Sequence, residues 1–471
     1  MKPMHGTTVR CAWLLAWALG VVPLGAQPRP GDRVYTADQV SNTVSVIDPV
    51  RNEPLGVLPL GDPFPAGLSP LYRGALLVHG LGFSPDGRTL AVVSIGSNSV
   101  TLLETATLRV RATVYVGRAP HEAFFTPDGR ELWVAVRGEN YVSVIDPNAG
   151  REVRRIPTAD GPAMVLFRPD GRYAFVPSSF VPELTVIDVR AHRPVARVRQ
   201  VSAFSPNLAV SRDGREVWVT LKDVGKVQVI EARPPFATKA VLETGPITNH
   251  VALVDAPTGS FAYVTVGGRN EVQVYRRGPV LQRVATIPVG DLPHGVWAAP
   301  DGQRVYVGLE NGDAVVAIDT RTNTVVATIP VGQLPQALVY VPGAAPQGRD
   351  RTALRPLGEA ARRWQRTLLA ASGGRGRASV VVNSLGVVDH LQIAAVDLDP
   401  GRAYRLELVV PGQLPLTLAR LVASPAGVAT AQSIGPVKRA LQGDGAAVPG
   451  QLRLVAEDNG VEVLIEAPSG P

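Results

Sequence analysis

A unit of 42 to 44 residues recurs along most of this chain, and it limits the possible folds more than any other feature. Equivalent positions fall at residues 79, 121, 163, 207, 250, 294 and 336. Each copy contains short runs of β-forming residues, such as 132–136 and 142–145, separated by turn residues. A period of this length built from short strands is typical of a β-propeller, in which each repeat forms one four-stranded blade.

The first strand of several copies ends in Pro-Asp-Gly, at 85–87, 127–129, 169–171 and 300–302. Proline presets φ, aspartate bonds the nearby backbone, and glycine accepts a positive φ. These tripeptides therefore predict tight turns between the first and second strands of the blades.

The two ends of the repeat region complement each other. Residues 34–61 supply only the second, third and fourth strands of a blade, and residues 336–341 supply only a first strand. Pairing them would complete one blade and remove the free sheet edges. The sequence therefore predicts a closed, seven-bladed, all-β propeller over residues 27–341.

The N-terminal segment has the pattern of a secretory signal peptide, spanning residues 1–26. Lys2 and Arg10 precede an apolar run at 12–22, and small residues end at Ala26. The run is too short to span a bilayer. We expect an exported protein, periplasmic or extracellular, with no transmembrane segment in the mature chain. The single cysteine, Cys11, lies in this leader, so the mature chain would have no thiol.

The formal charge of +7 does not indicate a nucleic-acid partner. The basic residues are nearly all arginines and are scattered through turns and outer strands, without a basic stripe that alternates with aromatic residues. We expect no binding to nucleic acid.

The repeat stops after Pro342. Residues 342–376 read as a linker and a short amphipathic helix, because Leu357, Ala361, Trp364 and Leu368 follow helical spacing. Short alternating segments separated by glycine-containing turns then fill residues 377–471. They predict a small C-terminal β-sandwich domain.

The repeat region also resembles a known family. The segment VYVGLENGDAVVAIDTRTNTVVATIPVGQLPQALVYV, at 305–341, is similar to the YVTN-type β-propeller repeat of exported bacterial and archaeal surface proteins. The resemblance covers roughly residues 34 to 341. It implies the propeller fold, but such propellers include binding proteins, surface-layer components, lactonase-like enzymes and parts of metalloenzymes.

Histidines occupy the start of the innermost strand in four copies. They are His79, His121, His250 and His294, while the other copies have Ala163, Asn207 and Gln336 at this position. Because these strand entrances surround one mouth of the central channel, the four histidines, Asn207 and Gln336 are candidate ligand or metal-binding residues.

Three interpretations of this ring remain open. The imidazoles could bind copper, zinc or iron, although no cofactor is predicted outright. They could activate water for lactone hydrolysis, with Arg118, Glu122 or Asp291 assisting. They could also be repeat residues that fill the channel and bond neighbouring backbone.

One copy departs from the repeat by a long insertion at residues 62–78. It contains Phe64, Leu71, Tyr72 and Arg73, and it begins on the same side as the histidines. Insertions in a rigid scaffold often carry binding surfaces, so these four residues form a candidate recognition loop. We expect an exported binding or surface-interaction protein without catalysis that contacts a small molecule, a protein or a cell-envelope component at this face. The alternative is a lactonase-like or metal-dependent enzyme.

Overall fold

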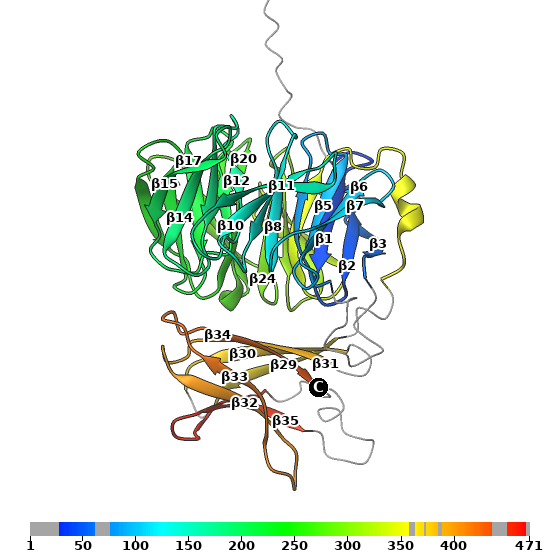
Figure 1. Ribbon diagram of the computed structural model, residues 1–471. Coiled ribbons are helices and arrows are strands. Elements are labelled where there is room, and N and C mark those ends of the chain that lie inside the picture. The colour runs from blue at the N-terminus through cyan, green and yellow to red at the C-terminus, as the bar shows by residue number, and fades with distance from the viewer. Residues whose placement is uncertain are drawn as a thin grey trace, which may run out of the picture.

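The computed structural model describes residues 28–61, 76–357, 363–371, 374–384, 389–435 and 450–467. In these ranges the chain forms a ring of blades and a separate C-terminal sheet (Figure 1). The predicted signal peptide lies outside the described residues.

Seven four-stranded sheets, formed within the described residues, confirm the predicted propeller. From the innermost strand outward they are β28 (Pro335–Val341), β1 (Arg33–Asp38), β2 (Thr43–Asp48), β3 (Glu53–Pro59); β4 (Val78–Phe83), β5 (Thr89–Ser94), β6 (Ser99–Glu104), β7 (Arg109–Tyr115); β8 (Pro120–Phe125), β9 (Leu132–Val136), β10 (Tyr141–Asp146), β11 (Arg151–Pro157); β12 (Leu166–Phe167), β13 (Tyr173–Pro177), β14 (Glu183–Asp188), β15 (Arg193–Arg199); β16 (Leu208–Val210), β17 (Glu216–Leu221), β18 (Lys226–Glu231), β19 (Thr238–Glu243); β20 (Thr248–Ala256), β21 (Gly259–Val266), β22 (Glu271–Arg276), β23 (Gln282–Pro288); and β24 (Pro293–Ala298), β25 (Arg304–Leu309), β26 (Ala314–Asp319), β27 (Thr324–Pro330).

The ring closes as the sequence predicts. Strand β1 pairs antiparallel with β28, with Val34 opposite Tyr340. Beside this pairing the Arg33 guanidinium donates to both oxygens of Asp350, at 2.6 and 3.2 Å. Asp350 belongs to the 3-10 turn η2 (Arg349–Ala353), so the segment after the last strand also holds the first one in place.

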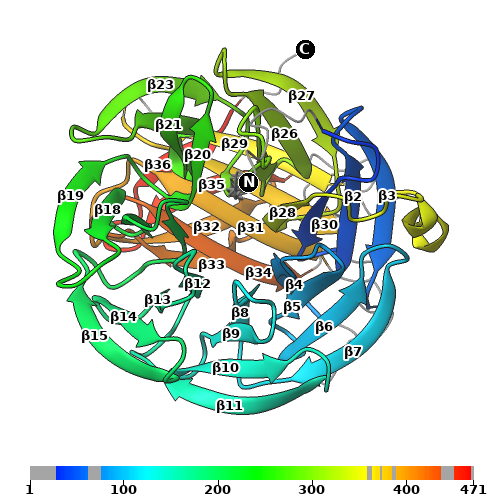
Figure 2. The same ribbon diagram turned by 90° about the horizontal axis from the view of Figure 1, so that it is seen from above.

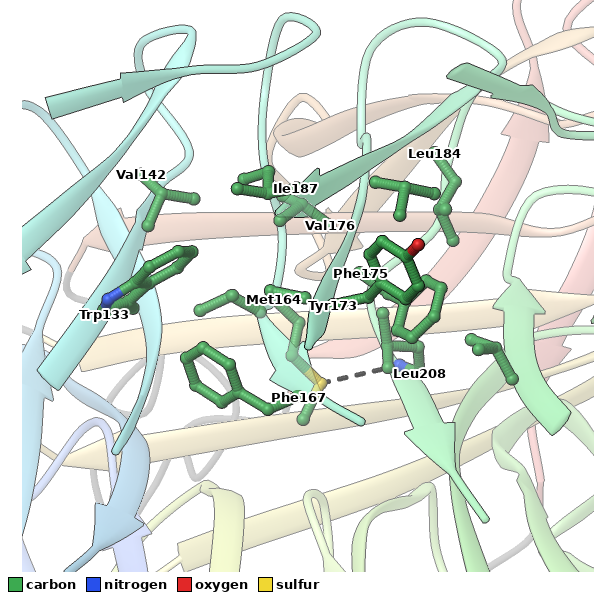
Figure 3. Close-up of a cluster of buried hydrophobic side chains, with 14 of the residues drawn as sticks. Trp133, Val142, Met164, Phe167, Tyr173, Phe175, Val176, Leu184, Ile187 and Leu208 are labelled. Carbon is green, nitrogen blue, oxygen red and sulfur yellow. Dashed lines mark hydrogen bonds between the residues drawn. The ribbon is translucent and has the colours of Figure 1, made fainter. Parts of the chain in front are cut away.

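Aromatic and branched side chains fill the space between neighbouring blades. In Figure 3, Trp133 of the β8–β11 blade lies beside Phe167 of the next blade, with the ring centroids 5.1 Å apart. The predicted turns are present too: Gly87 has a φ of 69°, and the Asp86 carboxylate accepts the Arg88 N–H at 3.1 Å. This packing makes the inner strands a rigid frame for the channel.

The C-terminal domain is all-β, but its sheet arrangement differs from a sandwich of two sheets. Strands β33 and β34, at the two edges of a single eight-stranded sheet, lie against each other, so the sheet is nearly closed into a barrel around an apolar core. Its order is β33 (Leu416–Val422), β32 (Ala403–Val409), β35 (Gln451–Ala456), β36 (Glu462–Glu466), β29 (Arg363–Ala370), β30 (Arg377–Ser384), β31 (Asp389–Val396) and β34 (Ala429–Gly435).

The predicted amphipathic helix within 342–376 is wrong. Residues 363–370 form strand β29, which pairs with β30 and β36. Leu368 is fully buried between the more exposed Thr367 and Leu369, which is the period of a strand. In the described part of the chain, the helical elements are the 3-10 turns η1 (Gly267–Arg269) and η2. No helix there has the length and apolarity needed to cross a membrane.

The C-terminal sheet covers one end of the propeller channel. Seen from above, its strands lie behind the centre of the ring (Figure 2). Ala394 and Val396 of β31 pack on Ile247 and Leu292, which precede inner strands of two blades. Gln392 of β31 donates to Glu310 Oε1 at 2.6 Å, in the turn between β25 and β26. The sheet therefore lies on the face at which the inner strands begin.

Candidate functional site

The inner strands bring the four histidines together in two neighbouring pairs. Nε2 of His79 lies 2.9 Å from Nε2 of His121, and their ring centroids are 4.3 Å apart. The rings of His250 and His294 have centroids 4.5 Å apart. Each member of a pair comes from the start of an adjacent blade, so the repeat itself creates the pairs.

A backbone hydrogen bond to the next blade orients one ring of each pair. Nδ1 of His121 donates to the carbonyl of Ala163, and Nδ1 of His294 donates to the carbonyl of Gln336, both at 2.7 Å. A carbonyl oxygen only accepts, so in both rings the proton lies on Nδ1. In the neutral ring, Nε2 then carries a lone pair.

Glycines next to two of the histidines allow the blades to approach closely. A Cβ on Gly80 would lie 2.2 Å from the His121 carbonyl and 2.9 Å from Oε2 of Glu122. A Cβ on Gly295 would lie 2.7 Å from the Gln336 carbonyl. In the His-Gly sequences at 79–80 and 294–295, the glycine therefore lets the next blade come close to the histidine-bearing strand.

Burial determines the protonation states at this end of the channel. It lowers the pKa of His79 to about 3 and lowers the pKa of His121, His250 and His294 well below the usual value, so the rings are neutral. It also raises the pKa of Glu122 well above the usual value, although the Leu81 backbone donates to this carboxyl group. Burial therefore favours the protonated form of Glu122.

Three charged residues that we did not predict lie near the histidines. Oε2 of Glu310 is 3.9 Å from Nε2 of His294. Arg137 and Lys222 lower the pKa of His79 electrostatically. All three side chains come from the segment joining the second strand of a blade to the third, and these segments return to the face where the first strands start. Blade topology could therefore have identified them, but we interpreted these segments only as turns.

Asn207 and Gln336 each form hydrogen bonds with neighbouring blades. Oδ1 of Asn207 accepts the Val251 N–H at 3.0 Å, and its amide donates toward the Met164 sulfur at 3.1 Å. Gln336 contributes its backbone carbonyl to His294. Both residues are buried.

The proposed recognition-loop residues Phe64, Leu71, Tyr72 and Arg73 lie outside the described residues.

A pocket of about 230 Å³ lies along the channel and is lined by inner strands of all seven blades. Most of its wall is apolar and includes Phe124 and Trp297, whose rings stack with a centroid distance of 6.2 Å. Its polar residues are Glu122, Asn207 and His250.

The C-terminal sheet covers the face of the propeller toward which one end of the pocket points. Along β20 the lining residues change from buried His250 and Val251 to half-buried Leu253. Leu253 lies toward the Pro-Asp-Gly turns, so the pocket opens on the face away from the C-terminal sheet. Its polar residues lie near the starts of the inner strands, at the covered end.

Comparisons with known proteins agree with this fold. A family model described as "Lactonase, 7-bladed beta-propeller" matches residues 114–329. No curated protein matches the chain.

Among solved structures, the hydrazine synthase of Kuenenia stuttgartiensis is 21% identical with a TM-score of 0.52, over 59% of this chain and 94% of that one. The periplasmic gluconolactonase of Pseudomonas aeruginosa is 21% identical with a TM-score of 0.51, over 66% and 99%. A protein of unknown function from Desulfotomaculum acetoxidans is 13% identical with a TM-score of 0.56, over 66% and 98%. At these identities the similarity concerns the fold.

Proposed function

We propose that this protein is an exported binding protein that holds a small, mostly apolar molecule in the propeller channel. The observation that carries the proposal is the channel pocket, whose polar groups gather toward the face that the C-terminal sheet covers. Apolar walls with a few convergent polar groups are the usual composition of a small-molecule site. We place the ligand inside the channel and not at the face expected from sequence, because the C-terminal sheet covers the face that carries the histidines.

The volume limits the size of the ligand. A protein cavity of about 150 Å³ accommodates benzene, so by proportion a pocket of about 230 Å³ suits a molecule of roughly ten non-hydrogen atoms. A short alkyl chain or single ring would contact Phe124 and Trp297. A carbonyl at the other end of the molecule would accept a hydrogen bond from Glu122 in the protonated form that burial favours.

γ-Octalactone, with ten non-hydrogen atoms, is a suitable probe. Binding should quench or shift the fluorescence of Trp297, and isothermal titration calorimetry should give one site per chain. Ala298→Phe, which adds a ring at the half-buried opening, should weaken binding at least about tenfold. Val326→Phe, on the exposed outer strand of the same blade, is the matched control and should bind normally. Equal binding by both variants would contradict the channel site.

Export is part of the proposal and is supported by the signal-peptide pattern at residues 1–26. N-terminal sequencing of protein secreted by a bacterial host should begin at or near Gln27. A mature protein that retains residues 1–26 would contradict cleavage.

A second candidate function, lactone hydrolysis, is favoured by the lactonase family model that matches residues 114–329. His250 lines the pocket, and its Nε2 has no hydrogen-bond partner in the described part of the chain. In this reaction His250 would take a proton from water as the water oxygen bonds to the lactone carbonyl carbon. The ring C–O bond would then break, and the leaving oxygen would take up a proton, yielding a hydroxy acid.

Acid release from γ-octalactone separates the two functions. Hydrolysis predicts acid release that falls at least about a hundredfold in His250→Gln and is unchanged in the control His192→Gln, a histidine paired with Glu131 outside the channel. Binding without acid release would leave the binding function and exclude hydrolysis of this lactone.

A further inference from the structure

Three buried side chains at the end of the channel that the C-terminal sheet covers could act as ligands for one cation. A nitrogen of His79, a nitrogen of His121 and a carboxylate oxygen of Glu122 all lie within 4.8 Å of one another. The three residues are between 2% and 7% exposed. They come from adjacent strands, β4 and β8, that packing holds in place.

The hydrogen bonds that the two imidazoles form through Nδ1 would leave a lone pair on each of the two Nε2 atoms that face each other. His121 donates through Nδ1 to Ala163, so its Nε2 carries a lone pair. Nδ1 of His79 lies 3.4 Å from Oε1 of Gln39, a contact in which this nitrogen donates. With that tautomer, Nε2 of His79 also carries a lone pair, and it faces the lone pair of His121 across 2.9 Å. Either a cation lies between the two nitrogens, or His79 has the other tautomer and donates to His121.

We propose that His79, His121 and Glu122 form a binding site for a divalent transition-metal ion, with zinc as the probe. Two imidazoles and one carboxylate are a common ligand set for zinc and for non-haem iron. The backbone hydrogen bond of His121 is the second contact that metal-bound histidines normally have, because it fixes the tautomer and the ring orientation.

The distances are compatible with such a site after small movements of the imidazoles and of Glu122. Zinc–nitrogen bonds of about 2.0–2.1 Å place tetrahedral donors roughly 3.3 Å apart. The two imidazole nitrogens, at 2.9 Å, have to move apart by about 0.4 Å to reach this spacing. The Glu122 oxygen has to approach from within 4.8 Å. Glu122 also lines the channel pocket, so a cation can reach the site from the open face.

The charged residues near the proposed site have opposite effects on a bound cation. Arg137 and Lys222 lie close enough to His79 to interact with it electrostatically, and both would repel a cation. Glu310 also interacts with His79 and would attract a cation. Removing Lys222 should therefore tighten metal binding, whereas removing either histidine should weaken it.

Zinc titration of the full-length protein, after removal of metal with a chelator, tests the site. Calorimetry should give one equivalent, and cobalt should give visible absorption bands of an ordered site. His79→Gln and His121→Gln should each weaken zinc binding at least about tenfold. His192→Gln should bind as the unmodified protein does, and Lys222→Met should bind severalfold more tightly. Circular dichroism checks that each variant is folded.

Uptake below about 0.1 equivalent of zinc and cobalt would overturn the proposal and leave a hydrogen bond between His79 and His121. Unchanged zinc binding in a folded His121→Gln variant would also overturn it. The proposal does not rest on the channel ligand: the zinc titration contains no lactone, so the two can fail separately.

Discussion

The buried ion pair at the ring closure should make a large contribution to the stability of the propeller. Arg33 and Asp350 have side chains only 4% and 0% exposed, and two hydrogen bonds join them across the junction of the first and last strands. Asp350→Ala would leave the guanidinium buried without its partner carboxylate. Removing one partner of a buried ion pair typically costs about 3–5 kcal/mol of unfolding free energy.

Thermal unfolding followed by circular dichroism measures this effect. At about 2 °C per kcal/mol, the lower end of the range for domains of 150–250 residues, the midpoint should fall by about 6–10 °C. Glu183→Ala is the matched control, because its partner Arg197 is 68% exposed and such pairs contribute at most about 1 kcal/mol. The double variant Arg33→Met/Asp350→Leu should recover most of the loss, since it leaves no unpaired charge. A decrease as small as that of the control would refute the reasoning.

Three further predictions concern single positions. Burial raises the pKa of Asp38 to about 7 from 3.8, so the folded state holds this proton more tightly than the unfolded state does. The stability that the protonated Asp38 contributes to the fold is present below about pH 4 and is lost as the pH rises through 7. Urea titrations should show the unfolding free energy of Asp38→Asn rising by a few kcal/mol relative to that of the unmodified protein between pH 4 and pH 8. A pH-independent difference would contradict the assignment. Gly82→Ala places a Cβ 1.9 Å from the Ala123 carbonyl and should lower the unfolding free energy by more than about 3 kcal/mol in the same titration. Gly343→Ala, where φ is 60° and no atom lies within 4 Å of the new Cβ, should lower it by only about 1 kcal/mol. Gln392→Ala removes the hydrogen bond to buried Glu310 and should speed hydrogen exchange in β31 and the β25–β26 turn while leaving exchange in β1 unchanged.

The repeat was sufficient to predict most of the fold. Glycine and proline spacing defined the blades, and the missing first strand before residue 34 predicted the pairing of β1 with β28. The helix prediction at 357–368 was wrong because four apolar residues happened to follow helical spacing. The strand there is stabilised by pairing with β30 and β36, which lie later in the sequence, and local spacing does not reveal such partners.

The sequence was less informative about the site. Repeat position placed His79 beside His121 and His250 beside His294, because equivalent residues of adjacent blades are neighbours. The position of the C-terminal sheet over these histidines depends on contacts such as Gln392 with Glu310, and those residues follow no repeat. For the same reason, the pocket opening on the opposite face could not be predicted.

A crystal structure of the protein with γ-octalactone tests the central claim most directly. The account predicts electron density for one lactone inside the channel, with its alkyl chain against Trp297 and its carbonyl toward Glu122. An empty channel at saturating lactone, or a lactone bound only outside the ring of inner strands, would contradict it.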